Sequence, residues 1–234
     1  MVASGIPARI NAMLTRSAKD TIPPRLDTHA PAICVLASGS KGNATYLSDG
    51  HTRILVDSGL SGIQIERRLA IRGISPVDLD AIVVSHEHSD HIQSVGVLAR
   101  RFNLPVYISS DTAAASGKKL GRLQKVVHFC CGNSFKINSL RIHPFSISLD
   151  AADPAGFTFQ VNGKKVGIAT DLGIATNLVK SNLSDCAVLI IEANHDLDML
   201  INGPYPWPLK QRVKGRSGHL SNQDTGHRDR DAHR

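Results

Sequence analysis

The sequence predicts a mixed α/β fold in which two β-sheets pack face to face and helices flank them. Three observations support this fold class. Short runs of apolar, β-branched residues recur along the chain, and Asp-Gly or Asn-Gly pairs typical of hairpin turns join several of them. Segments with helical periodicity lie between these runs. The whole pattern occurs once in each half of the chain, so two packed sheets are expected.

The first half is expected to begin with three short strands and to continue with alternating helices and strands. Residues 33–59 contain three strand-like runs, and Asp49-Gly50 forms the turn between two of them. Apolar residues at helical spacing predict an amphipathic helix that ends at Gly73. The other predicted elements are strand 79–85, helix 91–102, strand 105–109, and a short helix over 112–123 capped by Asp111 or Thr112.

The second half repeats this pattern. Strands are expected over 125–129, 139–148 and 156–171, and Asn162-Gly163 makes the last of these a hairpin. A helix near 174–183 and a buried strand over 187–194 follow.

The composition fits one domain with a sizeable core. The chain has 234 residues, of which 41% are hydrophobic, enough for a single domain of about 200 residues. We expect this domain over 32–222, between a disordered extension (1–31) with no assigned function and a charged, disordered tail (223–234). No run of ~18 apolar residues occurs, so no membrane partner is expected. The four cysteines form no CxxC pair, which favours a reduced, cytoplasmic chain.

The charge distribution favours a polyanionic partner. The formal net charge is +7. Such a charge favours association with a polyanion and speeds its approach, but it does not indicate which reaction the protein catalyses. Near the C-terminus, cations alternate with other residues at Lys210, Arg212, Lys214 and Arg216. Such a stretch can bind a phosphate backbone, and Tyr205 and Trp207 just before it can stack on a base. An ordinary solvated surface is the alternative.

The densest group of coordinating side chains is HEHSDH, residues 86–91, directly behind the predicted strand 79–85. His86 and His88 are two residues apart, so in extended backbone their side chains lie on one side and can share a cation. Asp90 and His91 follow where the chain turns into a helix, and can face a neighbouring position. Imidazole and carboxylate ligands suit Zn²⁺, with Mn²⁺ or Fe as competitors. Two such ions ~3.5–4 Å apart can activate water and clamp a phosphoryl or carbonyl group.

HEHSDH resembles the H-x-H-x-D-H signature of the metallo-β-lactamase fold, a four-layered αββα sandwich of metal-dependent hydrolases. The resemblance covers about residues 32–222. Within it, the segments LASGSKGNATYL, ILVDSGLS, GIATDLG, EANHD and GPYPWPLKQRVKGRSGHLSN are similar to the YycJ/WalJ-type branch. That branch is associated with 5′-to-3′ exonuclease activity on DNA. The resemblance therefore implies this fold, up to two divalent metal ions, and nucleic acid, above all DNA, as partner; the fold transfers more securely than the substrate.

The resemblance also implies a ligand set. His86 and His88 match ligands of the first metal, Asp90 and His91 match ligands of the second, and Asp171 in GIATDLG matches the carboxylate that bridges both. Asp171 can alternatively cap the following helix.

Further residues match family positions beside the metals. Asp57 in LVDSG matches a carboxylate that orients ligands through hydrogen bonds. His195 in EANHD is placed to contact a scissile phosphate or leaving group, and Asp90 is expected to position the attacking water. The glycine-rich turn at 39–43 can present backbone N–H groups to a phosphate, or serve only as a tight turn.

Two departures from the family pattern set limits on this ligand set. The third ligand of the first metal is a histidine in the family, and the aligned position here is Leu149, which cannot coordinate. The family also continues beyond GHLSN with a second histidine motif that this chain lacks, so the chain resembles a C-terminally truncated member. His219, in the first of those motifs, is a candidate replacement ligand for the second metal.

Two classes of function remain open from the sequence. One is a metal-dependent hydrolase resembling a nucleic-acid phosphodiesterase, impaired by the loss of a ligand. The other is a degenerate, non-catalytic member or fragment of the same fold. A small-molecule phosphodiesterase or thioesterase is a third possibility, and the basic stretch 210–216 counts against it.

Overall fold

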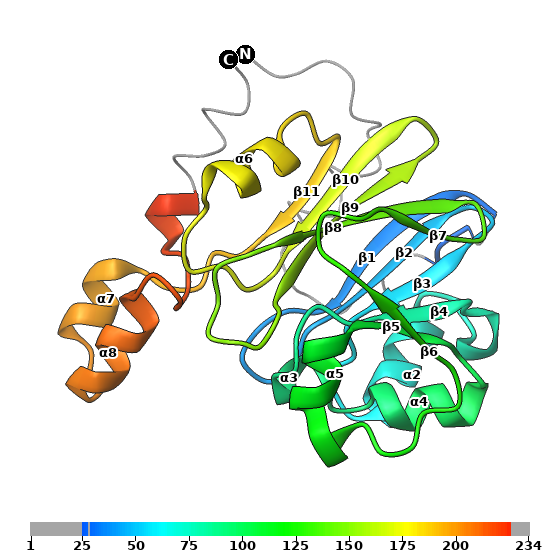
Figure 1. Cartoon of the computed structure of the whole chain (residues 1–234), viewed down its shortest axis with the longest axis horizontal. Helices are drawn as coiled ribbons and strands as arrows, with labels where there is room; N and C mark the ends of the chain where they lie inside the picture. Colours follow the sequence, from blue (N-terminus) through cyan, green and yellow to red (C-terminus); the bar gives the residue numbers. More distant parts are fainter. Residues whose placement is uncertain (1–24, 28, 226–234) are drawn as a thin grey trace.

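The computed structural model describes residues 25–27 and 29–225, and its elements carry the labels of Figure 1. Two β-sheets lie against each other, with helices on the outer faces (Figure 1). The first sheet has the order β1-β2-β3-β4-β5-β6, and the second has the order β11-β10-β9-β8-β7. The predicted fold class, an αββα sandwich, is confirmed.

The first sheet changes from antiparallel to parallel pairing at β3. Antiparallel pairs join β1 to β2 and β2 to β3, whereas β3 to β6 pair in parallel. Parallel neighbours need a crossover connection, and helices supply most of these crossovers. The strands are β1 (Pro31–Ala37), β2 (Ala44–Asp49), β3 (Arg53–Val56), β4 (Ala81–Val83), β5 (Val106–Ser109) and β6 (Val126–Phe129).

The second sheet is an antiparallel meander with one parallel strand added. Hairpins connect β7 through β10, and β11 pairs with β10 in parallel after a helical crossover. Asn162 and Gly163 both have positive φ in the β9–β10 turn, as expected for an Asn-Gly hairpin. The strands are β7 (Phe135–Ile137), β8 (Leu140–Ser146), β9 (Ala155–Val161), β10 (Lys164–Ala169) and β11 (Val188–Ile191).

The helices fall into two covering layers and one projecting pair. Helices α2 and α4 pack on the first sheet, α6 packs on the second, and α7 and α8 stand apart from both sheets (Figure 1). No helix in the described part of the chain is long and apolar enough to cross a bilayer. The helices are α2 (Gly62–Ile71), η1 (Pro76–Asp78), α3 (Ser89–Ile92), α4 (Val95–Phe102), α5 (Ser110–Ser116), η2 (Gly117–Lys119), α6 (Asn177–Leu183), α7 (Leu197–Asn202) and α8 (Trp207–Lys214).

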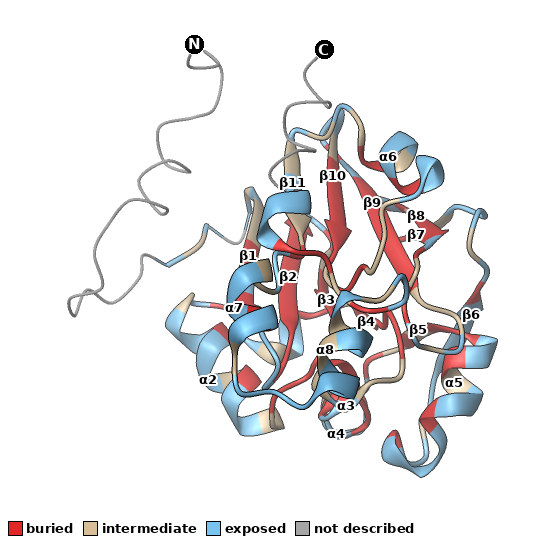
Figure 2. Cartoon of the chain, turned by 90° about the vertical axis from the view of Figure 1, so that its left-hand side faces the viewer, coloured by how far each residue is buried: buried red, intermediate tan, exposed pale blue. Residues whose placement is uncertain are grey.

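Alternate side chains of a central strand belong to two different hydrophobic cores, one on each face of the first sheet. In β3, Leu55 joins the cluster under the helices, whereas Ile54 and Val56 join the cluster between the two sheets. Successive side chains on a strand point to opposite faces, so a strand buried on both faces has an unbroken apolar sequence. Figure 2 shows these central strands as buried and the helices as exposed on their outer sides. A third cluster lies between the second sheet and α6.

Several predicted boundaries were wrong, each for a local reason. The helix predicted over 91–102 is divided into α3 and α4, and Ser94 between them leaves helical geometry while its hydroxyl contacts that of Ser58 at 2.7 Å. The N-cap of α5 is Ser109, which accepts from the Thr112 N–H, and not Asp111 or Thr112. The sequence did not predict β7, α7 or α8 as separate elements.

The predicted domain limits are only partly within the described residues. The first strand begins at Pro31, next to the expected start of the domain at residue 32. Most of the predicted extension 1–31 and residues 226–234 of the predicted tail lie outside the described residues. The division into extension, domain and tail therefore stays a prediction.

Candidate metal centre

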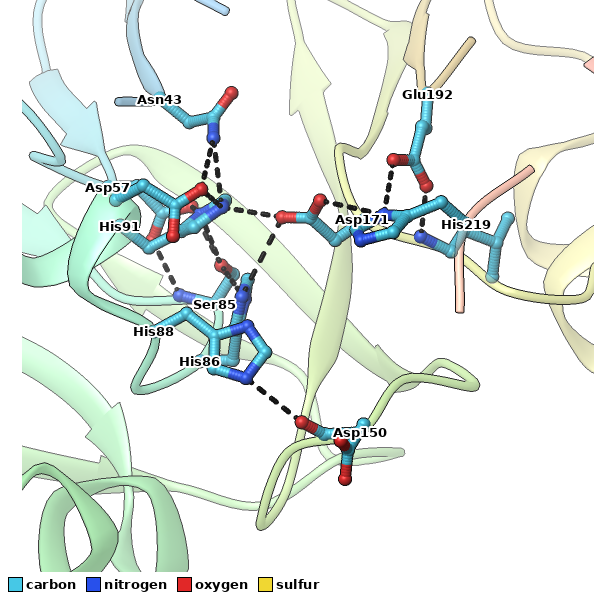
Figure 3. Close-up of polar contacts among 12 residues, drawn as sticks. Asn43, Asp57, Ser85, His86, His88, His91, Asp150, Asp171, Glu192 and His219 are labelled. Atoms are coloured by element: carbon cyan, nitrogen blue, oxygen red, sulfur yellow. Dashed lines mark hydrogen bonds and ion pairs between the residues drawn. The ribbon is translucent and has the colours of Figure 1, made fainter. Parts of the chain in front are cut away.

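A cluster of histidines and carboxylates lies where strand ends meet at one edge of the sandwich (Figure 3). Most of these side chains lie within a few residues of a strand end, so the strands fix where the side chains begin. The contributing residues are Asp57 after β3, His86 and His91 after β4, Asp171 after β10, Glu192 after β11, and His219 near the end of the described chain.

Asp171 is the centre of the cluster. Its Oδ2 lies 2.5 Å from His91 Nε2 and 3.6 Å from His86 Nε2. Its Oδ1 lies 3.5 Å from His219 Nδ1. The side chains of His86, His91 and Asp171 form one group able to hold a metal ion, and those of Asp171, Glu192 and His219 form another. Asp171 belongs to both groups, which is the arrangement required of a bridging carboxylate.

One buried nitrogen in this cluster, His86 Nε2, lacks a hydrogen bond within the described structure, and it faces Asp171 Oδ2. The close neighbour that Asp171 Oδ2 does have is His91 Nε2, at 2.5 Å. A buried polar atom without a partner is costly, because it has given up hydrogen bonds to water without replacement. Nitrogen and carboxylate oxygen atoms directed at a common point fit a divalent cation. The residues present at this point therefore fit the metal that the sequence motif implies.

Oxygen atoms hold the ring nitrogens that face away from Asp171. His91 Nδ1 lies 2.8 Å from Asp57 Oδ2, and His86 Nδ1 lies 2.9 Å from the hydroxyl of Ser85. Asp57 is fixed in turn by the N–H and the hydroxyl of Ser85. Donation from Nδ1 leaves a lone pair on Nε2, which is the form of imidazole that binds metals. Asp57 therefore lies where the sequence analysis expected an orienting carboxylate.

The electrostatics of the cluster favour a positive charge beside Asp171. Burial lowers the pKa of His86 well below its usual value, and His91 lowers it further. Burial also acts to lower the pKa of His91, but the carboxylates of Asp57 and Asp171 outweigh burial and raise this pKa to about 10. Burial acts to raise the pKa of Asp171, but the hydrogen bond and charge of His91 outweigh burial and lower it to about 2. A proton on His91 thus occupies a position that a cation can take.

His219 and Glu192 form the second group. His219 Nδ1 is 2.6 Å from Glu192 Oε1, and the Leu172 N–H donates to Glu192 Oε2. The hydrogen bond from His219 to Glu192 raises the pKa of His219, whereas burial raises the pKa of Glu192. A proton on His219 Nδ1, the nitrogen that faces both Glu192 and Asp171, thus also occupies a position that a cation can take. Glu192 was not predicted from the sequence, although it ends the apolar run AVLIIE much as Asp57 and Asp171 follow apolar runs. The strand in this run was predicted to be buried, but it is only half-buried, and Leu189 is exposed.

The remaining histidine of the motif, His88, lies beside this centre but in neither group. Its Nε2 donates to the backbone carbonyl of Asp150 at 2.9 Å. A carbonyl only accepts, so this bond leaves Nδ1 of His88 with the free lone pair. The ring of His88 stands edge-on to that of His86, with centroids 4.6 Å apart. Leu149 is buried and directly precedes Asp150, so its backbone lies one residue from this contact.

Asp90 is half-buried above His91. Its Oδ2 is 3.7 Å from His91 Nε2 and 3.4 Å from Asn43 Nδ2, which also lies 3.0 Å from His91 Nε2. A backbone hydrogen bond fixes the position of Asp90, because its carbonyl accepts from the Asn43 N–H at 2.7 Å. A Cβ at Gly59 would collide with that same carbonyl, so only glycine allows the loop after β3 to lie this close. Like Glu192, Asn43 was not predicted from the sequence to belong to the site.

His195 lies next to the segment that carries His219. An isolated parallel bridge joins His195 to Ser221, and the His195 carbonyl accepts from the Asn222 N–H. Its Nδ1 is buried without a hydrogen-bond partner in the described residues. Burial lowers the pKa of His195, and His219 lowers it further. His195 is in neither metal-binding group. From the sequence it was expected to contact the substrate and not a metal ion.

The four predicted substrate-binding cations lie on and after α8. Arg212, Lys214 and Arg216 carry their charges toward the outside, whereas Lys210 is half-buried and its Nζ donates to the Ile201 carbonyl at the end of α7. Arg212 lies 3.5 Å from the carboxylate of Asp150, the residue whose carbonyl contacts His88. The basic helix is therefore adjacent to the histidine motif.

Comparisons with known proteins agree with this geometry. Residues 52–228 match the family model of the beta-lactamase superfamily domain. Exodeoxyribonuclease YycJ of Bacillus anthracis is 37% identical over 193 residues, covering 81% of this chain and 73% of that protein. Exodeoxyribonuclease WalJ of Streptococcus pneumoniae is 40% identical over 195 residues, covering 81% of this chain and 72% of that protein.

Solved structures agree on the fold. The metallo-β-lactamase fold protein YhfI of Bacillus subtilis superimposes with a TM-score of 0.67 at 16% identity, covering 86% of this chain and 82% of YhfI. Zn²⁺-bound PqqB of Methylobacterium extorquens superimposes with a TM-score of 0.60 at 16% identity, covering 76% and 68% respectively. Fold and site together define a metal-dependent hydrolase of αββα architecture. The chain belongs to the metallo-β-lactamase superfamily, and within it to the YycJ/WalJ branch.

The raised pKa of His91 predicts a stability change with pH in the metal-free chain. His91 titrates near 10 when folded and near 6.5 ordinarily, so its contribution is complete below pH 6.5 and is lost as the pH rises to about 10. One extra native proton makes the unfolding free energy fall by about 1.4 kcal/mol per pH unit in this window. Asp57→Asn removes one of the two carboxylates and should flatten this slope, which urea unfolding from pH 7 to pH 10 measures.

Asp185→Asn is the matched control for this substitution. Asp57 and Asp185 both have positive φ, of 59° and 55°, and asparagine tolerates this conformation. Asp185 is exposed, so its replacement should leave the slope unchanged. Equal slopes for the native chain and the Asp57→Asn variant would contradict the assignment of the His91 proton to these carboxylates.

Proposed function

We propose that this protein is a metal-dependent phosphodiesterase that cleaves nucleic acid, with DNA as the substrate and zinc as the preferred metal. The observation that carries the proposal is the buried Asp171 Oδ2 that faces both His91 Nε2 and the unpartnered His86 Nε2 at the strand-end edge of the fold. The names of the YycJ and WalJ relatives, both exodeoxyribonucleases, support the choice of substrate. The four free cysteines support a cytoplasmic location.

The proposed ligands combine members of the two metal-binding groups with their neighbours in the motif, His88 and Asp90, as the family resemblance implies. His86, with Asp171 and the Nδ1 of His88, is proposed for the first ion; Asp90 and His91, with Asp171 and His219, are proposed for the second. A divalent ion held here supplies Lewis-acid polarisation of a phosphoryl oxygen and lowers the pKa of water. Imidazole nitrogen favours zinc over the harder oxygen-seeking cations, with manganese and iron as alternatives.

The other side chains orient the reactants. Asp90, held by Asn43, is suited to accept a hydrogen bond from the attacking water and so direct it at phosphorus. His195 has an unpartnered, buried Nδ1, and we propose that this atom contacts the scissile phosphate or the leaving oxygen. Arg212, Lys214 and Arg216 extend the positive potential away from the centre, where they can hold the phosphates that are not cleaved.

A second candidate function has one specific observation in its favour. By the family resemblance, the buried Leu149 stands at the position of a histidine that completes the first metal site, and we propose that this ion therefore has three protein ligands at most. A protein with one weakened metal site can bind nucleic acid without cleaving it. Catalysis and binding alone are separated by the experiments that follow.

Hydrolysis of a 5′-phosphorylated, end-labelled DNA strand by the metal-reconstituted chain tests the proposed function directly. Asp171→Asn should lower the rate by more than about 100-fold, because loss of even an outer partner of a ligand costs 10- to 100-fold. Asp111→Asn, which changes an exposed carboxylate on α5, should leave the rate unchanged. Product formation is measured by gel electrophoresis with and without EDTA. Cleavage of bis(p-nitrophenyl) phosphate but not of DNA would favour a small-molecule phosphodiesterase instead.

Leu149→His should raise the amount of metal bound per chain. The new imidazole lies one residue from the Asp150–His88 contact, so it can add a ligand to the first site. Elemental analysis of both proteins after identical zinc reconstitution and desalting gives the stoichiometry. Leu149→Gln has similar bulk and polarity without an imidazole and should bind no more metal than the native chain. Equal metal content in the native and Leu149→His proteins would contradict this placement of position 149.

Salt dependence tests the four predicted cations. Replacing Lys210, Arg212, Lys214 and Arg216 with glutamine should weaken binding to single-stranded DNA. The plot of log K against log salt should flatten by about 0.7 for each phosphate that the variant no longer neutralises. A matched variant neutralises the same number of exposed cations near α5, namely Lys118, Lys119, Arg122 and Lys125. Both slopes are measured by fluorescence anisotropy. If the two variants change the slope equally, the charges near α8 contribute to DNA binding only through the net charge of the protein.

A further inference from the structure

The projecting pair α7 and α8 carries apolar and aromatic side chains that the two sheets do not cover. Trp207 is 65% exposed and Tyr205 is 54% exposed, and Met199 at 75% lies on the neighbouring helix. Figure 2 shows both helices as exposed. Large aromatic side chains usually lose most of their surface to the core. An exposed pair on an outlying hairpin therefore indicates a binding surface.

Cations follow the aromatic pair along the chain. Lys210, Arg212, Lys214 and Arg216 follow Trp207 along the same segment. Trp207 and Lys214 are seven residues apart, two helical turns, so they project from the same side of α8. The eight residues of α8 span about 12 Å, at 1.5 Å per residue. This length equals roughly three stacked nucleotides, at 3.4 Å each.

The C-terminal end of the projecting pair α7 and α8 is joined to the candidate metal centre. After α8, the His219 N–H donates to the Val213 carbonyl at 2.9 Å, which directs the chain back toward Asp171. The Arg216 carbonyl accepts from the Ser148 hydroxyl at 2.8 Å. A strand lying along α8 from Trp207 toward Arg216 would therefore run toward the metal-binding groups.

We propose that Tyr205, Trp207 and the adjacent cations of α8 form a binding surface for single-stranded nucleic acid, on which unpaired bases stack. A duplex keeps its base faces inside, whereas a single strand offers them to aromatic side chains, and flanking cations hold the phosphates. The net charge of +7 disfavours a second copy of the chain as the occupant and favours a polyanion. This inference rests on the proposed function, since it names the form of nucleic acid that the centre receives.

The chain supplies its own reporter, because Trp207 is its only tryptophan. The full chain, with EDTA present to prevent cleavage, is titrated with a 12-nucleotide oligo-dT strand and with a blunt DNA duplex of equal length. Stacking should quench the Trp207 emission with the single strand at concentrations where the duplex has little effect. Equal quenching by the blunt duplex, or no quenching by either DNA, would overturn the inference. An emission change on raising the protein concentration alone would assign the surface to a second copy.

Substitutions separate stacking from general apolar contact. By anisotropy with labelled oligo-dT, Trp207→Ala should weaken binding by about 5- to 100-fold, the range that one base–aromatic stack provides. Trp207→Leu should lose a similar amount because leucine has no π-face, whereas Trp207→Phe should retain most of the affinity. Ile63→Ala removes an apolar side chain that is 60% exposed on α2 and should have no effect. Full affinity in the Trp207→Leu protein would reject stacking.

The two proposals can fail independently. Cleavage of DNA by the metal-loaded chain without single-strand quenching would leave the proposed function intact and reject only the stacking surface. Quenching without cleavage, in zinc or manganese, would support the surface and reject hydrolysis.

Discussion

The charge on Asp171 is the constraint on which the rest of the site depends. The carboxylate is largely buried, and both of its oxygens face imidazole nitrogens from different parts of the chain. An unpaired charge in such a position costs far more than a neutral group. Positive charge must therefore be supplied locally, by a proton on His91 or by a metal ion, and the surrounding segments are arranged so that either can be held.

The strands meet this constraint through their ends. Asp57, Asp171 and Glu192 each follow an apolar strand, so each carboxylate emerges at the same edge of the fold. Asp57 even adopts a positive φ of 59° to do so, a conformation unusual for a residue other than glycine. Its two hydrogen bonds from Ser85 hold it there. Backbone strain of this kind is typical of functional sites, where neighbouring contacts offset its cost.

Local patterns in the sequence predicted much of this structure, and contacts between distant segments account for what they missed. The unbroken apolar runs around Leu55 and Ile82 located two of the central strands, and the turn at Asn162-Gly163 located a hairpin. The spacing of HEHSDH predicted a cluster of histidines, and the family resemblance added Asp171. The structure groups His86 with His91 rather than with His88. In contrast, Ser94 interrupts the predicted helix because it contacts Ser58, 36 residues earlier. Glu192 orients His219 across 27 residues, and no periodicity in one sequence reveals such a pairing.

The bridge between His195 and Ser221 has a consequence for how such a protein can change. Residues on either side of the α7–α8 excursion meet there, and the Asn194 N–H also donates to the Leu220 carbonyl. An excursion whose two ends are already held together can be lengthened, shortened or exchanged with little effect on the body from which it departs. Substrate preference can then evolve on the hairpin while the carboxylates and imidazoles at its base stay in register. The proposed binding surface and the proposed metal centre thus lie on parts of the fold that can change separately.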